Sequence, residues 1–104
     1  MAYSLLASKR FRKQLGELDE STKTRVKETL KGLTEDPFTS RPNVDIKQLK
    51  NTNPKKYRLR VGDFRIFYFI GNEEIKLLKI ADRKMHIKDN SYYRFLNFNL
   101  VENL

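Results

Sequence analysis

Apolar and basic positions alternate along residues 55–61, and after a glycine–aspartate pair the chain continues into an apolar run that ends at Ile70. A period of two predicts β-strands, and a short glycine-containing pair between two such runs predicts a hairpin. With Gly62-Asp63 as the loop, the register pairs Val61 with Phe64, Arg60 with Arg65, Leu59 with Ile66, and Arg58 with Phe67.

The two faces of this predicted hairpin differ in chemistry. One face carries Arg58, Arg60 and Arg65. The other face is apolar and comprises Tyr57, Leu59, Val61, Phe64, Ile66, Tyr68 and Ile70. Like charges directly opposite each other destabilise a sheet. The arginine face is therefore expected to hold an anion.

The remaining pattern predicts three helices and two further strands. Residues 2–7 form a strand, Ser8 caps a helix to about residue 18, and a second helix from residues 19–21 ends before Pro37. Residues 38–55 form a loop, Gly71-Asn72 a turn and residues 74–81 a strand, and a last helix follows residues 89–91. Phe67 and Phe69 either pack beneath this helix or serve as stacking platforms for bases. We expect one α+β domain over residues 1–104, ordered β-α-α-β-β-β-α, with helices on one face of an antiparallel meander.

Positive charge concentrates around the hairpin. The chain of 104 residues carries 22 Lys+Arg against 13 Asp+Glu, a net charge of +9. Residues 47–88 hold 12 basic and 4 acidic residues, so most of the excess lies there. This distribution indicates a binder of polyanions such as nucleic acid.

Several classes of protein are disfavoured by composition. There is no cysteine and His86 is the single histidine, so we expect no disulfide, no metal site and no cofactor. No signal peptide and no apolar run long enough to span a membrane are visible, which predicts a cytoplasmic protein.

The chain resembles the RelE/ParE toxin superfamily. The resemblance rests on Leu49-Lys50, on residues 57–68 (YRLRVGDFRIFY) and on residues 79–84 (KIADRK). It implies the toxin of a type II toxin–antitoxin pair. In the RelE branch, such a toxin enters the ribosomal decoding site and cleaves mRNA by attack of a ribose 2′-hydroxyl on the adjacent phosphate.

The same resemblance assigns roles to residues of this chain. Arg65 and Arg83 match arginines that stabilise the phosphate in the transition state. Arg58 and Arg60 match a basic pair that holds the RNA, with Lys56 and Lys84 as further phosphate contacts. Arginine cannot be deprotonated in proteins, so the pair can grip phosphate but cannot act as the base.

The family's catalytic tyrosine has no counterpart here, because Ile87 or Lys88 stands at that position. Either the role falls to His86, Tyr92 or Tyr93, or this member does not cleave. His86 is the candidate acid or base, since histidine changes its charge near neutral pH.

The sequence therefore leaves three functions open. The first is a ribosome-dependent endoribonuclease, whose partners are the ribosome, mRNA and a RelB-like antitoxin. The second is a ParE-like toxin that poisons DNA gyrase and needs no catalytic base. The third is a basic nucleic-acid-binding module without toxicity. The resemblance, rather than any spacing of residues, implies the antitoxin.

Overall fold

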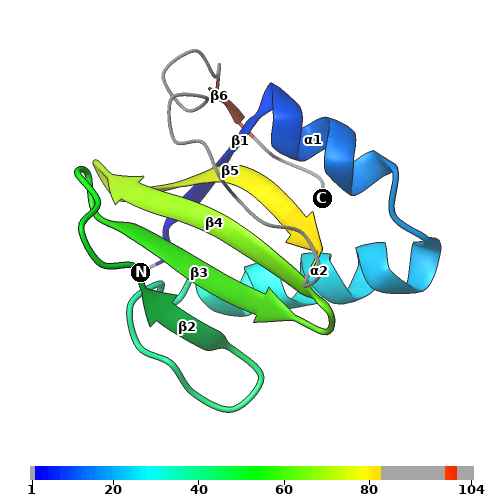
Figure 1. The fold of residues 1–104 in the computed structure, drawn as a ribbon, viewed down its shortest axis with the longest axis horizontal. Coiled ribbons are helices and arrows are strands. Elements are labelled where there is room, and N and C mark those ends of the chain that lie inside the picture. The colour runs from blue at the N-terminus through cyan, green and yellow to red at the C-terminus, as the bar shows by residue number, and fades with distance from the viewer. Residues whose placement is uncertain (1, 83–97, 101–104) are drawn as a thin grey trace.

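One mixed sheet organises the protein, whose structure is a computed structural model that describes residues 2–82 and 98–100. Within these residues the strand order is β2-β3-β4-β5-β1-β6 (Figure 1). The strands are β1 (Ser4–Ser8), β2 (Asp45–Gln48), β3 (Lys56–Val61), β4 (Phe64–Gly71), β5 (Glu74–Asp82) and β6 (Phe98–Leu100). Strands β2 to β5 form an antiparallel meander, whereas β1 pairs parallel with β5 and antiparallel with β6. The predicted α+β class is confirmed.

The β3–β4 hairpin has the predicted register, from Val61 opposite Phe64 to Arg58 opposite Phe67. Gly62 has φ 59°, a left-handed conformation that costs glycine little. Glycine at the first central position is typical of a type II′ turn, whose twist matches that of the strands. The turn therefore fixes which side chains share a face.

Two helices cover one face of the sheet, as predicted. Helix α1 (Lys9–Gly16) begins after Ser8, whose side chain accepts a hydrogen bond from the backbone N–H of Phe11. Helix α2 (Glu20–Leu33) begins after Asp19, which caps the backbone N–H of Thr22. Hydrogen bonds from Thr22 and Ser21 favour the Asp19 carboxylate and lower its pKa to about 2.

The main core lies between these helices and the sheet. From the helices it takes Phe11, Leu15, Val26, Leu30 and Leu33. The hairpin supplies its whole predicted apolar face: Tyr57, Leu59, Val61, Ile66 and Tyr68 are buried, with Phe64 and Ile70 packed against them. The opposite sheet face is left for the arginines, and Figure 1 shows α2 behind the sheet.

Three local predictions were wrong. Residues 45–48, predicted as loop, form the edge strand β2 against β3. The β4–β5 turn consists of Asn72 and Glu73 rather than Gly71-Asn72, because Gly71 still pairs with Glu74. Residues 98–100, predicted as helix, form β6; the rest of that helix lies outside the described residues.

Candidate nucleic-acid interface

The sheet face opposite the helices gathers seven cations from four strands, and we call it the basic face. Its cations are Lys47, Lys56, Arg58, Arg60, Arg65, Lys76 and Lys79, placed there by strand register. Directly paired residues form three rows across the strands: Asp45-Arg60-Arg65-Ala81, Lys47-Arg58-Phe67-Lys79 and Lys56-Phe69-Lys76. Neighbouring rows lie about 6.6 Å apart, two residues along a strand.

The first row places two guanidinium groups side by side. Arg60 of β3 is directly opposite Arg65 of β4. Arg65 donates a hydrogen bond from Nη2 to the backbone oxygen of Asp82 at 3.3 Å, which ties its head to the end of β5. Arg60 is exposed beside it. Two arginines in this arrangement can share one phosphate through bidentate hydrogen bonds.

The second row holds a partly satisfied arginine. Arg58 Nη2 contacts Asp45 Oδ1 at 3.2 Å, and the side chain of Arg58 is 15% exposed. Its Nε is buried and has no hydrogen-bond partner within the described part of the chain. Since buried donors are nearly always paired, this N–H is available to an incoming acceptor such as a phosphate oxygen.

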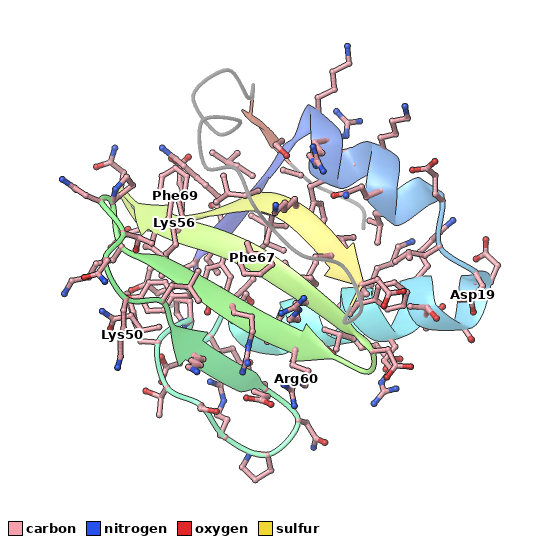
Figure 2. The ribbon with its side chains drawn as sticks, viewed as in Figure 1. Asp19, Lys50, Lys56, Arg60, Phe67 and Phe69 are labelled. Atoms are coloured by element: carbon pink, nitrogen blue, oxygen red, sulfur yellow. The ribbon has the colours of Figure 1, made fainter. Side chains whose placement is uncertain are left out.

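Phe67 and Phe69 run along the middle of the basic face (Figure 2). Phe67 is buried in a small second core with Leu78 and Ala81, while Phe69 is half-buried against it. The Nζ atoms of Lys79 and Lys76 lie 5.8 and 5.5 Å from the centres of the Phe67 and Phe69 rings, respectively. Phe67 is therefore part of the packing, and only Phe69 keeps a partly open surface.

The structure brings together four of the predicted site residues: Lys56, Arg58, Arg60 and Arg65. The other three, Arg83, Lys84 and His86, lie outside the described residues. Sequence reasoning missed Lys47, because β2 was read as loop. It also missed Lys76 and Lys79, although the doublet Leu77-Leu78 interrupts the alternation of β5 and signals a change of face.

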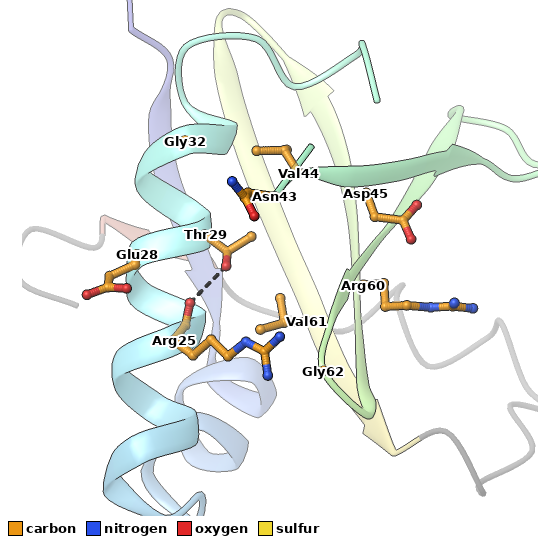
Figure 3. Close-up of a pocket in the computed structure, with 10 residues that line it drawn as sticks. All are labelled: Arg25, Glu28, Thr29, Gly32, Asn43, Val44, Asp45, Arg60, Val61 and Gly62. Carbon is orange, nitrogen blue, oxygen red and sulfur yellow. Dashed lines mark hydrogen bonds between the residues drawn. The ribbon is translucent and has the colours of Figure 1, made fainter. Parts of the chain in front are cut away.

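A hollow of about 600 Å³ lies beside the basic face, between α2 and the hairpin turn (Figure 3). Arg25 of α2 reaches toward Val61 and Gly62, and its Nη1 would lie 3.1 Å from a side-chain carbon at Gly62. The charged residues of the lining are Arg25, Glu28, Asp45 and Arg60. These charges balance, so the hollow lacks the positive excess of the basic face.

No helix among the described residues is long and apolar enough to cross a membrane. In the same residues, no cluster of three or more histidine, aspartate or glutamate side chains is arranged to hold a metal ion.

Comparison with known families gives the class of this small α+β domain with one basic sheet face. The family described as "ParE toxin of type II toxin-antitoxin system, parDE" matches residues 5–87. The chain belongs to this family. No curated protein matches the chain significantly in sequence.

Solved structures of RelE toxins share the fold. The archaeal RelE–RelB complex from Pyrococcus horikoshii is 29% identical, with a TM-score of 0.70, and the match covers 83% of this chain and 100% of the other. The RelB–RelE antitoxin–toxin complex from Methanococcus jannaschii is 25% identical, with a TM-score of 0.64, covering 76% and 91%. The isolated E. coli RelE toxin is 16% identical, with a TM-score of 0.66, covering 89% and 94%, and this likeness concerns the fold alone.

Proposed function

We propose that this toxin is a ribosome-dependent endoribonuclease that cleaves mRNA by attack of a ribose 2′-hydroxyl on the adjacent phosphate. The observation that carries the proposal is the basic face, with its paired arginines Arg60 and Arg65. Likeness to the archaeal RelE structures supports the RelE branch of the superfamily. Because its proposed target is the translating ribosome, we expect the toxin to act in the cytoplasm.

The alternating cations of β3 suit a single RNA strand. Lys56, Arg58 and Arg60 recur every second residue, so their side chains project at intervals of about 6.6 Å along one face. That interval is comparable to the distance between successive phosphates of an extended single strand. An RNA backbone running along β3 would meet one cation per phosphate, an arrangement that holds single strands without reading their sequence.

The scissile phosphate is assigned to the Arg60–Arg65 pair. Arg65 is fixed by the Asp82 carbonyl oxygen, so it is oriented before the substrate arrives. Fixed donors stabilise the extra negative charge of the transition state without reorganising during the reaction. Arg83 follows Asp82 directly in the sequence and is proposed to contact the same phosphate, with Lys84 as a neighbouring phosphate contact. His86 is proposed to give a proton to the leaving 5′-oxygen.

An antitoxin is proposed as the cognate protein partner. The two archaeal relatives are structures of RelE with RelB. A basic face of seven cations calls for an acidic segment to neutralise it, and an acidic RelB-like peptide has that character. Covering the basic face would also block RNA.

The decisive test compares cleavage of ribosome-bound mRNA with cleavage of free mRNA by the purified toxin. Programmed ribosomes with mRNA in the decoding site are expected to yield cuts mapped by primer extension, while free mRNA stays intact. Arg65→Ala and Arg83→Ala are each expected to slow cleavage by about 10²–10³-fold, as for loss of a transition-state donor. Lys31→Ala, an exposed cation of α2, is the matched control and should cut normally. If Arg65→Ala and Arg83→Ala both cut like the parent, the assigned roles are wrong.

The second candidate function is poisoning of DNA gyrase, which the ParE family match favours. A supercoiling assay is run beside the ribosome assay. Inhibited gyrase with intact mRNA would replace the nuclease proposal by this one. Salt-sensitive binding of RNA, with neither reaction and no arrest of growth, would instead identify a nucleic-acid-binding module.

A further inference from the structure

Lys79 reaches the basic face only because β5 contains a bulge. The β4–β5 register shifts between Phe67 and Tyr68: Tyr68 pairs with Leu77, and Phe67 pairs with Lys79. Leu78 is the extra residue. With strict alternation from Lys76, residue 79 would point into the main core; the extra residue turns Lys79 outward instead. Bulges beside functional sites often re-aim a side chain in this way.

The bulge is held in place by a buried contact. The Ser8 hydroxyl donates a hydrogen bond to the Leu78 backbone oxygen at 2.6 Å, and Ser8 itself is fully buried. Lys79 is therefore positioned by β1 as well as by its own strand pairing. This double constraint gives the lysine a defined place at the end of the second row, beyond Arg58 and Phe67.

Lys79 is buried to an extent that is unusual for a lysine. It is 8% exposed. In the described part of the chain, Ser8 is the only other polar or charged residue that is buried. Arg65 lies diagonally from it on the neighbouring strand β4, and the backbones of such diagonal neighbours are about 7–8 Å apart, within reach of long side chains. Among the described residues, the other charged groups that the register places on this face are Lys47, Asp45, Lys56, Arg58, Arg60 and Lys76.

We propose that Lys79 takes the proton from the attacking 2′-hydroxyl. The inference rests on the proposed nuclease function and supplies the base that the arginines cannot be, since guanidinium does not deprotonate in proteins. Burial and surrounding cations both disfavour the ammonium form of a lysine, and enzymes use this effect to make lysine a base near neutral pH. Neither Arg58 nor Arg60 offers that chemistry.

The proposed step balances as follows. The 2′ O–H bond breaks and its proton goes to the neutral Nζ of Lys79. The O2′–P bond forms while the P–O5′ bond breaks, and the 5′-oxygen leaves with a proton from the acid. The products are a 2′,3′-cyclic phosphate and a 5′-hydroxyl end, and Lys79 returns its proton to water. Arg65 neutralises the phosphate throughout.

Two substitutions separate the charge of Lys79 from its proton chemistry. Lys79→Arg keeps a cation that cannot accept a proton, and Lys79→Met keeps an unbranched side chain without charge. On programmed ribosomes under single turnover, both are expected to cut about 10²–10⁴-fold more slowly than the parent. Lys31→Met, at an exposed lysine of α2 outside the basic face, is the control and should cut at the parental rate. Circular dichroism checks that each variant is folded.

Two further readouts distinguish a base from a structural role. The parent's cleavage rate is expected to rise with pH to a plateau, and the residual rate of Lys79→Arg should lose that rise. Methylamine is expected to restore part of the cleavage rate to Lys79→Ala. Lys79→Arg should bind 2′-deoxy-substituted mRNA, which cannot be cleaved, as tightly as the parent protein does. A Lys79→Arg protein that cuts at the parental rate and pH profile would overturn this inference and leave the nuclease standing. A parent that never cuts would instead remove the proposed function itself.

Discussion

Arg60 and Arg65 stand directly opposite each other across the β3–β4 hairpin, although like charges in this position work against the sheet. We expect Arg60→Thr to stabilise the fold by up to about 1 kcal/mol, because it removes the repulsion and suits a strand. The same change should weaken binding of single-stranded RNA and lower the salt slope by about 0.7, for one lost phosphate contact. Urea unfolding and salt titration of oligonucleotide binding check both effects.

Arg60→Lys is the control for this prediction, because it keeps the charge and hence the repulsion. It should retain the parental salt slope and gain little stability. If Arg60→Thr neither stabilises the protein nor lowers the salt slope, the Arg60–Arg65 pair neither destabilises the sheet nor contacts a phosphate.

Asp45 is the carboxylate of the first row and lowers the positive charge of the basic face. Its side chain is 50% exposed and pairs with Arg58 at 3.2 Å, so the ion pair itself contributes less than about 1 kcal/mol to stability. Asp45→Asn should therefore unfold close to the parent, yet bind single-stranded RNA roughly 3- to 10-fold more tightly at low salt. Glu28→Gln, a charge-matched change on α2, should leave the affinity nearly unchanged; an equal gain there would mean that only net charge matters.

Ser8 joins three elements through one hydroxyl. The hydroxyl accepts a hydrogen bond from the Phe11 N–H at 3.0 Å and donates one to the Leu78 backbone oxygen at 2.6 Å. Ser8→Ala should lower the free energy of unfolding by about 1–3 kcal/mol, because a helix cap and a buried carbonyl lose their partners together. Ser4→Ala, exposed on the same strand, should change it by less than about 0.5 kcal/mol. Chemical denaturation measures both, and similar small values would refute the buried role of Ser8.

The hairpin could be predicted from sequence because one signal fixed all of it. Gly62-Asp63 sets the turn, the turn sets the register, and the register sets both faces. The helix cap Ser8 was equally readable, since it is a short polar side chain just before an apolar periodicity, and the start of the second helix at residues 19–21 was readable in the same way. These are local rules, and the tertiary structure did not override them.

Features that depend on distant contacts could not be predicted in the same way. Strand β2 is short and polar, and it forms because Ile46 pairs with Leu59 of the neighbouring strand β3. The bulge at Leu78 depends on Ser8, which is 70 residues away in sequence. The helix predicted for the C-terminal part fails at residues 98–100 because pairing with β1 competes successfully with helical periodicity. Missing the bulge hid Lys79, the lysine of greatest chemical interest on the basic face.

Tyr68 links the core to the segment that follows α2. It is fully buried, and its hydroxyl donates to the Pro37 backbone oxygen at 2.8 Å. Burial, with a smaller contribution from Tyr57, raises the pKa of Tyr68 above the ordinary value of 10.0. The folded state therefore holds this proton more tightly than the unfolded state, so stability is retained below about pH 10 and falls as the pH rises beyond it. Tyr68→Phe should be less stable at pH 7 by about 1 kcal/mol but lose less on going to pH 11. Parallel urea titrations at the two pH values check this, and identical alkaline losses would contradict it.

Glu73 occupies a backbone conformation that suits glycine. Asn72 and Glu73 have φ 54° and 60°, the pattern of a type I′ turn, in which asparagine–glycine is the favoured pair. Glu73→Gly should therefore stabilise the protein by about 1 kcal/mol, since relief of the left-handed strain outweighs the added freedom of the unfolded chain. The hydrogen bond from the Ser4 N–H to the residue 73 backbone oxygen, 3.1 Å long, needs no side chain and should persist. Glu73→Ala is the control: it removes the same carboxylate but keeps the strain, so thermal unfolding should show no comparable gain. Equal gains in the two variants would assign the effect to charge rather than to the backbone.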